Sequence, residues 1–581
     1  MSPHSKPRRR AAFRGSGLKR LLLVSALKNI QRSLCGFGLI VGALFFAASL
    51  TPSLIPRSLE VQGVLAGVAF SFGYGIGALV GWMWRYLEIP SLSSRILRYI
   101  TLASAAICLC IVLFALRQAG IWQDSVRGVL GMAPVDTGYP FSVSLVAVAT
   151  FVTLLLVARG LIGIGRRIAN KLNSFLPRRV SIVAGIAITA VLTTTIVNGV
   201  LVDYAFRALD RSFERLDALI EPDRPQPLIA ERAGGPGSKL EWRKLGRTGR
   251  AFVASGPSAA EIRDFTQKPA LEPIRLYAGL QAAETPSERA KLLLDELIRV
   301  HAFDRAALVI ITPTGTGWVD PSAIDGLEFL FHGDVASVAL QYSYLNSPLS
   351  LLFQPERGLE SAEALFRAVY SHWKGLPVKE RPELYLHGLS LGAFNSQRSI
   401  TFFDILGDPI HGAVWSGAPF PSEKWRSLTD NRDAGSTEWL PVFQQGRFVR
   451  FMNQDGPPAG NTAQWGSVRF VYLQYASDAI TFFDKSLLYR EADWMKAPRG
   501  PDVSPALSWY PVVSMLQVLI DMPLADTVPM GYGHVYAPEH YLNAWLEATG
   551  IEGWSVQDVD ALKHHLRIRG QRNDGYEYRG G

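Results

Sequence analysis

Five long apolar runs lie before residue 203, and no run of comparable length follows. Each is close to the roughly 20 residues that an α-helix needs to cross a bilayer. Small residues recur within the runs, for example in the sequence GIGA at 75–78, and small side chains let helices approach closely in lipid. A soluble helical core is the alternative, but five consecutive runs favour a membrane. We therefore predict five transmembrane helices, at 39–54, 61–82, 100–116, 141–164 and 182–201.

The positive charge of the chain is concentrated at its N-terminus. The formal net charge is +9, and nine Lys and Arg residues lie before residue 35 with no Asp or Glu among them. The rest of the chain is therefore balanced in charge. We predict a basic cytoplasmic tail at 1–34 that contacts anionic lipid, and this distribution does not indicate a nucleic-acid-binding surface.

The charges between the apolar runs predict the orientation. Three Arg residues separate the second and third runs, and five Lys or Arg residues separate the fourth and fifth. The alternate loops hold only Arg57, and Arg117 with Arg127. Because basic loops stay in the cytoplasm, the N-terminus is predicted to be inside and everything after residue 203 outside. A cleaved signal peptide is the alternative for the first run, but the charged region before it is long and four more runs follow.

The chain after residue 203 has a different character. Apolar residues between 202 and 220 recur at spacings of three and four, which predicts an amphipathic helix, and 221–238 is a linker rich in Pro and Gly. From about residue 270, strand and helix patterns alternate, which favours a mainly parallel sheet with helices on both faces. We therefore divide the chain into 1–34, a membrane domain at 35–202, a helix and linker at 203–240, and a catalytic domain at 241–581. The predicted strands are 274–280, 307–312, 335–341, 384–387, 413–416 and 468–475.

A G-x-S-x-G sequence at 388–392 lies between a predicted strand and a predicted helix. That context is the one a nucleophile elbow requires, in which a sharp turn presents a serine hydroxyl at the edge of a sheet. The pentapeptide alone is a weak signal, since Gly and Ser are common. With both flanking elements, we predict that Ser390 is a nucleophile.

A serine hydroxyl needs a base, and the base needs a group to orient it. In α/β-hydrolases these partners follow the serine in the order acid, then histidine. Asp478 comes directly after a predicted strand, and His534 lies in the glycine-containing loop GYGH, so we predict a Ser390, Asp478, His534 triad. The alternative role for Asp478 is to cap the helix that follows it. The competing residues are Asp484 and Asp493 for the acid, and His387, His540, His564 and His565 for the base.

Attack on a carbonyl also builds negative charge that needs preorganised donors. The backbone N–H of Leu391, after the nucleophile, is one candidate, and the loop TPTGTGW after the second strand offers Gly315 and Thr316. A phosphate-binding loop is the competing interpretation, but no Gly-Lys-Ser/Thr sequence follows. We expect no metal site and no cofactor, because the histidines of this part are scattered and no His-Glu-x-x-His occurs.

The sequences TPTGTGWVDP at 312–321, HGLSLG at 387–392, VWSG at 414–417 and QYASD at 474–478 carry a resemblance to a known family. The chain resembles the membrane-anchored bacterial α/β-hydrolases, which join an N-terminal multi-helix membrane domain to a C-terminal esterase/lipase-like domain. The resemblance implies an α/β-hydrolase fold and a Ser–Asp–His triad that matches Ser390 and Asp478, with His534 by order. It implies no defined substrate. One departure is that no clear strand directly precedes His534, because 513–520 reads as helix.

We therefore expect a multi-pass protein of the inner or plasma membrane with a serine esterase in the periplasm or at the cell exterior. Its expected partners are the lipid bilayer and an ester or lipid-like substrate. Acyl transfer with the same triad, or ligand binding and signalling without turnover, are the alternatives. The five runs contain no Asp, Glu or Lys, which favours anchoring over transport.

Overall fold

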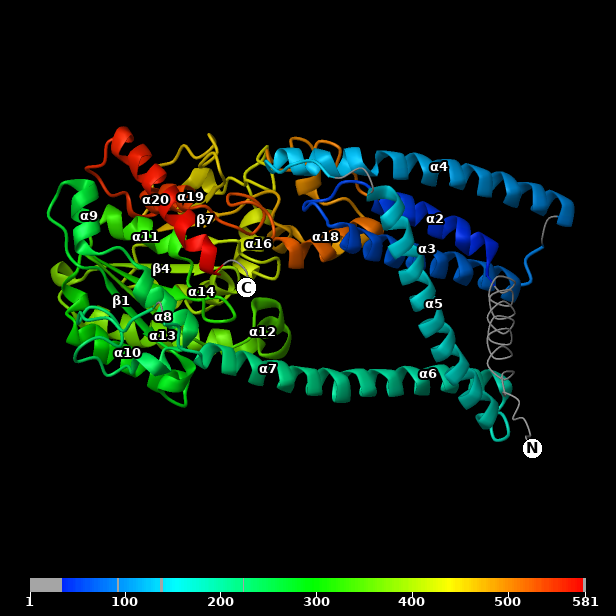
Figure 1. The fold of residues 1–581 in the computed structure, drawn as a ribbon, viewed down its shortest axis with the longest axis horizontal. Coiled ribbons are helices and arrows are strands. Elements are labelled where there is room, and N and C mark those ends of the chain that lie inside the picture. Colours follow the sequence, from blue (N-terminus) through cyan, green and yellow to red (C-terminus); the bar gives the residue numbers. More distant parts are fainter. Residues whose placement is uncertain (1–33, 91–92, 136–138, 223, 578–581) are drawn as a thin grey trace, which may run out of the picture. The chain divides into compact units, whose positions relative to one another are not determined.

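The computed structural model describes residues 34–90, 93–135, 139–222 and 224–577 (Figure 1). Residues 1–33, which hold almost all of the predicted basic tail, lie outside this described part. Two compact units interleave along the sequence. The first comprises the described parts of Met1–Thr51, Arg57–Gln123 and Val135–Gly160, and the second comprises Pro52–Pro56, Asp124–Pro134 and Leu161–Gly581.

The α-helices are α2 Gly36–Ser49, α3 Leu59–Tyr86, α4 Ser94–Val129, α5 Tyr139–Leu172, α6 Arg178–Ile196, α7 Asp203–Ala218, α8 Gly246–Ser255, α9 Ala259–Thr266, α10 Pro286–Arg299, α11 Pro321–Leu330, α12 Ser347–Phe353, α13 Pro355–Gly375, α14 Leu391–Arg398, α15 Phe402–Ile405, α16 Glu423–Asp430, α17 Ala479–Phe482, α18 Val513–Asp521, α19 Pro538–Thr549 and α20 Val556–Glu577. The strands are β1 Ile274–Ala278, β2 Ala307–Thr312, β3 Val335–Leu340, β4 Glu383–Leu389, β5 Gly412–Ser416, β6 Val449–Met452 and β7 Arg469–Leu473.

Four helices in the described residues are long and apolar enough to cross a membrane, and the prediction of five spans is corrected to that extent. They are α3, α4, α5 and the segment Arg178–Gly199. The first predicted run forms only the 14-residue helix α2. At 1.5 Å per residue such a helix is about 21 Å long, shorter than the ~30 Å apolar core of a bilayer. It ends at Ser49 because Pro52 disfavours helical geometry in the residue before it and offers no N–H itself.

Glycines set the packing of α2 on α3 within the first unit. Gly38 and Gly42 on α2 face Gly73 and Gly77 on α3. A Cβ atom on Gly77 would lie 2.7 Å from the Cα of Gly38, and one on Gly42 would lie 2.9 Å from the carbonyl oxygen of Phe70. Each pair is spaced by four residues, the repeat that lets two helix backbones touch along one face.

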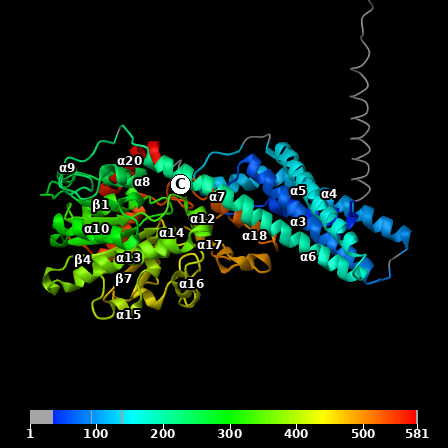
Figure 2. The ribbon, with the colours of Figure 1, turned by 90° about the horizontal axis from the view of Figure 1, so that it is seen from below.

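The second unit contains a seven-stranded sheet in the order β1-β3-β2-β4-β5-β7-β6, and every neighbouring pair is parallel. The predicted mainly parallel sheet is confirmed. Helices α11, α19 and α20 contact one another on one face, whereas α10 and α13 pack together on the other (Figures 1 and 2). Six of the strands were predicted. The seventh, β6, is four residues long and carries Arg450 in its middle, so its sequence lacks an apolar run.

The register of the sheet gathers four loops at one edge. Thr312 at the end of β2 is paired with Gly388, Leu389 at the end of β4 with Ser416, and Ser416 at the end of β5 with Leu473. Parallel strands all present their carboxyl ends at the same edge, which is where ligands bind in open α/β sheets. The loops that follow β2, β4, β5 and β7 are therefore neighbours.

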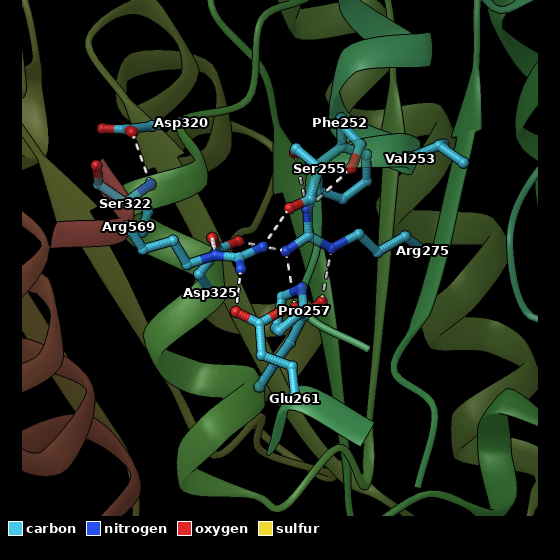
Figure 3. Close-up of polar contacts among 12 residues, drawn as sticks. Phe252, Val253, Ser255, Pro257, Glu261, Arg275, Asp320, Ser322, Asp325 and Arg569 are labelled. Carbon is cyan, nitrogen blue, oxygen red and sulfur yellow. Dashed lines mark hydrogen bonds and ion pairs between the residues drawn. The ribbon is translucent and has the colours of Figure 1, made fainter. Parts of the chain in front are cut away.

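A buried ionic cluster fastens helices to the outer part of the sheet at β1. Arg275 on β1 is fully buried and donates to Asp325 at 2.6 Å and to Glu328 at 2.7 Å, both on α11 (Figure 3). Arg569 on α20 donates to Asp325 at 2.7 Å and also to Glu261 on α9. Because a buried charge without a partner is costly, this cluster holds α9, α11 and α20 in one arrangement.

Asp320 lies at the start of α11 and is buried. One carboxyl oxygen accepts a hydrogen bond from the N–H of Ser322 at 2.9 Å, so Asp320 caps the helix (Figure 3). Burial raises the pKa of this carboxyl to about 7, and the cap bond opposes that shift.

The spacing of the glycines on α3 yields a prediction with an internal control. Gly77→Ala places a methyl group 2.7 Å from a backbone atom of α2, and overpacking of this kind costs roughly 1–3 kcal/mol. Gly75→Ala on the same helix meets nothing within 4 Å. We expect the midpoint of thermal unfolding in detergent to fall for the first variant and to stay level or rise for the second. Equal midpoints would contradict the close approach of α2 and α3.

The pKa of Asp320 yields a prediction about pH. Folded Asp320 keeps its proton up to about pH 7, whereas the unfolded chain loses it near the ordinary value of 3.8. The folded state therefore binds more protons between these values, and this group's contribution to the free energy of unfolding falls as pH rises through that window. Asp320→Asn keeps a capping oxygen and removes the titration. The difference in unfolding midpoint, variant minus wild type, should increase from pH 5 to pH 8. A constant difference would contradict the raised pKa.

Candidate active site

Ser390 occupies a sharp turn between β4 and α14. Its backbone has φ 55° and ψ −123°, a left-handed conformation that is rare for any residue except glycine. The two flanking glycines are sterically required. A Cβ atom on Gly388 would lie 2.4 Å from the carbonyl carbon of Gly392, and one on Gly392 would lie 2.2 Å from the carbonyl oxygen of Thr312. The turn therefore has the strained geometry of a nucleophile elbow, pressed against the end of β2.

Asp478 and His534 are hydrogen bonded. The Nδ1 atom of His534 lies 2.7 Å from Oδ2 of Asp478, and the backbone N–H of His534 donates to the carbonyl of Ala525 at 2.7 Å. The Nε2 atom of His534 is buried and has no hydrogen-bond partner among the described residues. One ring nitrogen is thus held by a carboxylate, while the other remains available.

The carboxylate of Asp478 is fully buried and accepts five hydrogen bonds. Oδ1 accepts the N–H of Ile480 at 2.9 Å and of Thr481 at 3.3 Å. Oδ2 accepts from His534, from the hydroxyl of Thr481 at 3.1 Å and from that of Tyr536 at 2.7 Å. Asp478 therefore caps α17 and binds His534 at the same time. The two roles considered for it from sequence, helix cap and partner of the histidine, are compatible.

Ser390 and His534 each lie against the end of β5. The N–H of Ser390 donates to the carbonyl of Ser416 at 3.0 Å. The next residue, Gly417, has φ 51°, and a Cβ atom there would lie 2.5 Å from Cε1 of His534. The imidazole thus packs on the backbone just beyond the residue to which the serine is bonded. Only glycine leaves room for the ring at this position.

The loop after β2 has a defined internal geometry. The N–H of Gly315 donates to the hydroxyl of Ser347 at 3.2 Å, so that donor is already engaged. The carbonyl of Thr316 accepts from Gln341 at 3.1 Å and from Thr248 at 3.2 Å, which fixes the following peptide unit. Among the described residues, neither the N–H of Thr316 nor that of Leu391, at the first position of α14, donates a hydrogen bond to a backbone carbonyl. Of the two donors predicted in this loop, Thr316 is therefore the one whose N–H has no partner in the part of the chain that the structure describes.

The competing residues have other partners. His387 is buried in β4 with Nδ1 2.8 Å from the carbonyl of Val414, and burial lowers its pKa to about 4. His540 contacts the hydroxyl of Tyr475 through Nδ1 at 2.6 Å, and burial lowers its pKa. Asp484 caps the short helix Lys485–Leu488, and Asp493 forms an ion pair with Arg432 at 2.9 Å.

Sequence reasoning missed a set of groups that support the histidine loop. The hydroxyl of Ser477 accepts the N–H of Gly533 at 2.9 Å. Asp502 in turn accepts the N–H of Ser477 at 2.9 Å and its hydroxyl at 2.5 Å, and burial raises the pKa of Asp502. Asp502 lies in an irregular loop between β7 and α18, where no periodic pattern marks it. Among the described residues, no group of three His, Cys, Asp or Glu side chains is arranged to hold a metal ion.

Two comparisons with known families bear on this geometry. Residues 274–562 match the alpha/beta-hydrolase family, and residues 50–257 match the N-terminal region of an alpha/beta-hydrolase family. No curated protein and no solved structure matches the chain significantly. The first match takes in all seven strands, the elbow and the histidine loop, and the second takes in the span-length helices. The chain therefore belongs to the alpha/beta-hydrolase family, with that family's N-terminal domain preceding its α/β domain.

Proposed function

We propose that this protein is a membrane-anchored serine hydrolase that cleaves an ester outside the cytoplasm. The proposal rests above all on one arrangement at His534. Its Nδ1 is bonded to the buried Asp478, its Nε2 has no partner among the described residues, and its ring packs beside the backbone that anchors Ser390. In a serine hydrolase a carboxylate orients an imidazole in this way, and the free nitrogen of the imidazole activates the serine.

The reaction follows from these positions. Ser390 Oγ attacks the ester carbonyl while Nε2 of His534 takes the hydroxyl proton. Asp478 keeps the proton on Nδ1 and stabilises the imidazolium that forms. We assign the N–H groups of Leu391 and Thr316 as the donors that stabilise the oxyanion. The imidazolium then gives its proton to the leaving alcohol, and a water activated by the same imidazole hydrolyses the acyl-enzyme at Ser390.

The extracytoplasmic placement rests on loop charge and on the number of crossings. If α3, α4, α5 and the segment Arg178–Gly199 each cross once, both basic loops lie on one side of the bilayer. The α/β domain then lies on the other side, which the positive-inside rule makes the outside. This argument uses the two basic loops alone, and the basic tail at 1–34 lies with them on the cytoplasmic side only if α2 also crosses. Segments Pro52–Pro56 and Asp124–Pro134, which fall on the same side as the α/β domain, belong to the same compact unit as that domain.

The proposed substrate is an ester with a lipid character, because a site tethered to a bilayer meets lipids at high local concentration. The tests below also distinguish two alternative functions. Acyl transfer would replace water by an alcohol acceptor at the same acyl-enzyme, and ligand binding without turnover would leave Ser390 unreactive.

The first test is labelling of the full chain by a fluorophosphonate, which reacts with activated serines. Wild type should be labelled, and Ser390→Ala should not. His534→Ala should slow labelling by about 10²–10⁴-fold, because general-base activation by a positioned histidine contributes about that factor. Ser399→Ala is the matched control, since Ser399 is a buried serine at the end of α14 whose hydroxyl donates to the carbonyl of Ser396 in its own turn at 2.9 Å. An unlabelled wild type would favour ligand binding.

The second test concerns the side of the membrane. The three native cysteines, Cys35, Cys108 and Cys110, are first replaced, because their free thiols would also react with the maleimide. Lys379→Cys and Asn173→Cys then report on two exposed positions, in the α/β domain and in the second basic loop. In sealed right-side-out vesicles, an impermeant maleimide should label the first and reach the second only after permeabilisation. The reverse pattern would place the α/β domain in the cytoplasm.

A further inference from the structure

Two short segments that adjoin the apolar helices are built into the core of the α/β domain. Pro52–Pro56 connects α2 to α3, and Asp124–Pro134 contains the end of α4 and the residues after it. Leu54 and Ile55 are each 1% exposed, and they belong to the same hydrophobic cluster as the core of the sheet. Segments of a membrane anchor that served only as connections would not need to be buried in this core.

The first segment binds a buried carboxylate. Asp521, the last residue of α18, is fully buried. It accepts hydrogen bonds from the hydroxyl of Ser53, from the N–H of Leu54 at 3.1 Å and from the N–H of Ile55 at 3.4 Å. These donors help to satisfy a buried carboxyl group, so the segment and the end of α18 are held together.

The end of α18 leads directly to the histidine. The short helix Met522–Leu524 follows, and the carbonyl of the next residue, Ala525, accepts the backbone N–H of His534. A Cβ atom on Gly533 would lie 3.3 Å from Cδ1 of Ile55 and 2.6 Å from the carbonyl oxygen of Ala525. Ile55 and the Ala525 carbonyl therefore both pack against the backbone that presents the imidazole.

The second segment reaches the same loop by another route. The hydroxyls of Ser125 and Ser504 lie 2.8 Å apart. Ser504 is two residues from Asp502, which binds Ser477, and the hydroxyl of Ser477 accepts the N–H of Gly533. Val126 and Leu130 of this segment are also buried in the core.

We propose that Pro52–Pro56 and Asp124–Pro134 form a histidine brace that positions His534 for catalysis, with Ser53 and Asp521 as its central positioning residues. This inference rests on the proposed hydrolase function. The brace fixes the backbone of the histidine loop from two sides, while Asp478 fixes the side chain. Both segments continue directly into apolar helices but belong to the same compact unit as the α/β domain, so residues at the ends of these helices complete the active site of that domain.

The expected effect is on turnover. Displacing a catalytic group by about 1 Å can cost roughly 10²-fold in rate, and loss of the Ser53 hydroxyl removes one of the donors to Asp521. Ser53→Ala should therefore lower kcat for a short acyl p-nitrophenyl ester, and the rate of fluorophosphonate labelling, by about tenfold with KM unchanged.

Ser238→Ala is the matched control. The hydroxyl of Ser238 donates to the buried Glu296 at 2.8 Å, and the neighbouring N–H of Lys239 donates to the same carboxylate at 2.7 Å. This repeats the pattern at Asp521, but Glu296 lies on α10, which contacts β1 at the opposite end of the sheet order from β7. Ser238→Ala also removes the acceptor of the N–H groups of Gly234 and Leu240, so it is the more disruptive of the two changes, and still only Ser53→Ala should lower kcat.

Two further readouts on the full chain separate positioning from general loss of stability. Hydrogen exchange of peptides covering 522–536 should accelerate in Ser53→Ala and not in Ser238→Ala. In a His534→Ala background, Ser53→Ala should not reduce the residual labelling rate further, because its effect acts through the imidazole. Ser53→Thr, which keeps a hydroxyl, should recover most of the rate.

The outcomes distinguish the brace from the proposed function. A wild type that fluorophosphonate does not label overturns the hydrolase function, and the brace is then judged by exchange alone. Equal exchange of 522–536 in the two serine variants overturns the brace in either case. Equal labelling rates for wild type and Ser53→Ala also overturn it, even if the enzyme is active.

Discussion

The parallel register of β2, β4, β5 and β7 is the constraint on which the site depends. It brings four loops, distant in sequence, to one edge of the sheet, where the elbow, Gly417 and Asp478 become neighbours. The glycines at 388, 392 and 417 then allow backbone and imidazole to approach more closely than a side chain would permit. Steric fit of the backbone thus determines this arrangement, and the chemistry proposed for Ser390 depends on that fit.

Buried carboxylates join segments that the sequence separates widely. Asp478 is satisfied by its own helix and by the histidine loop, Asp502 by Ser477, and Asp521 by the residues after α2. Each carboxylate would be costly to bury without its donors, so each requires its donating segment to be in place. In the proposed enzyme this requirement links Pro52–Pro56, the segment between α2 and α3, to the base of the triad.

Local patterns explain which features could be predicted. The elbow, the capping box at Thr285 and the apolar strands are encoded in a few consecutive residues. The short strand β6 was missed because Arg450 interrupts its apolar pattern, and the length of the first helix was overestimated because hydropathy does not register the effect of Pro52. Asp521 and Ser53 were not candidates, since 468 positions separate them and neither lies in a motif.

The sequence by itself determined the four span-length apolar helices, the parallel sheet and the serine turn, because hydrophobic periodicity and glycine chemistry act over neighbouring residues. It also supplied Asp478 and His534 as candidates by order and loop context. Only the tertiary structure decided that these two side chains are hydrogen bonded, that Gly315 is already engaged with Ser347, and that Ile55 packs against Gly533 in the histidine loop. Such contacts join residues that are far apart in the sequence. Their positions depend on the burial of apolar side chains and on hydrogen bonding of buried carboxylates across the whole fold.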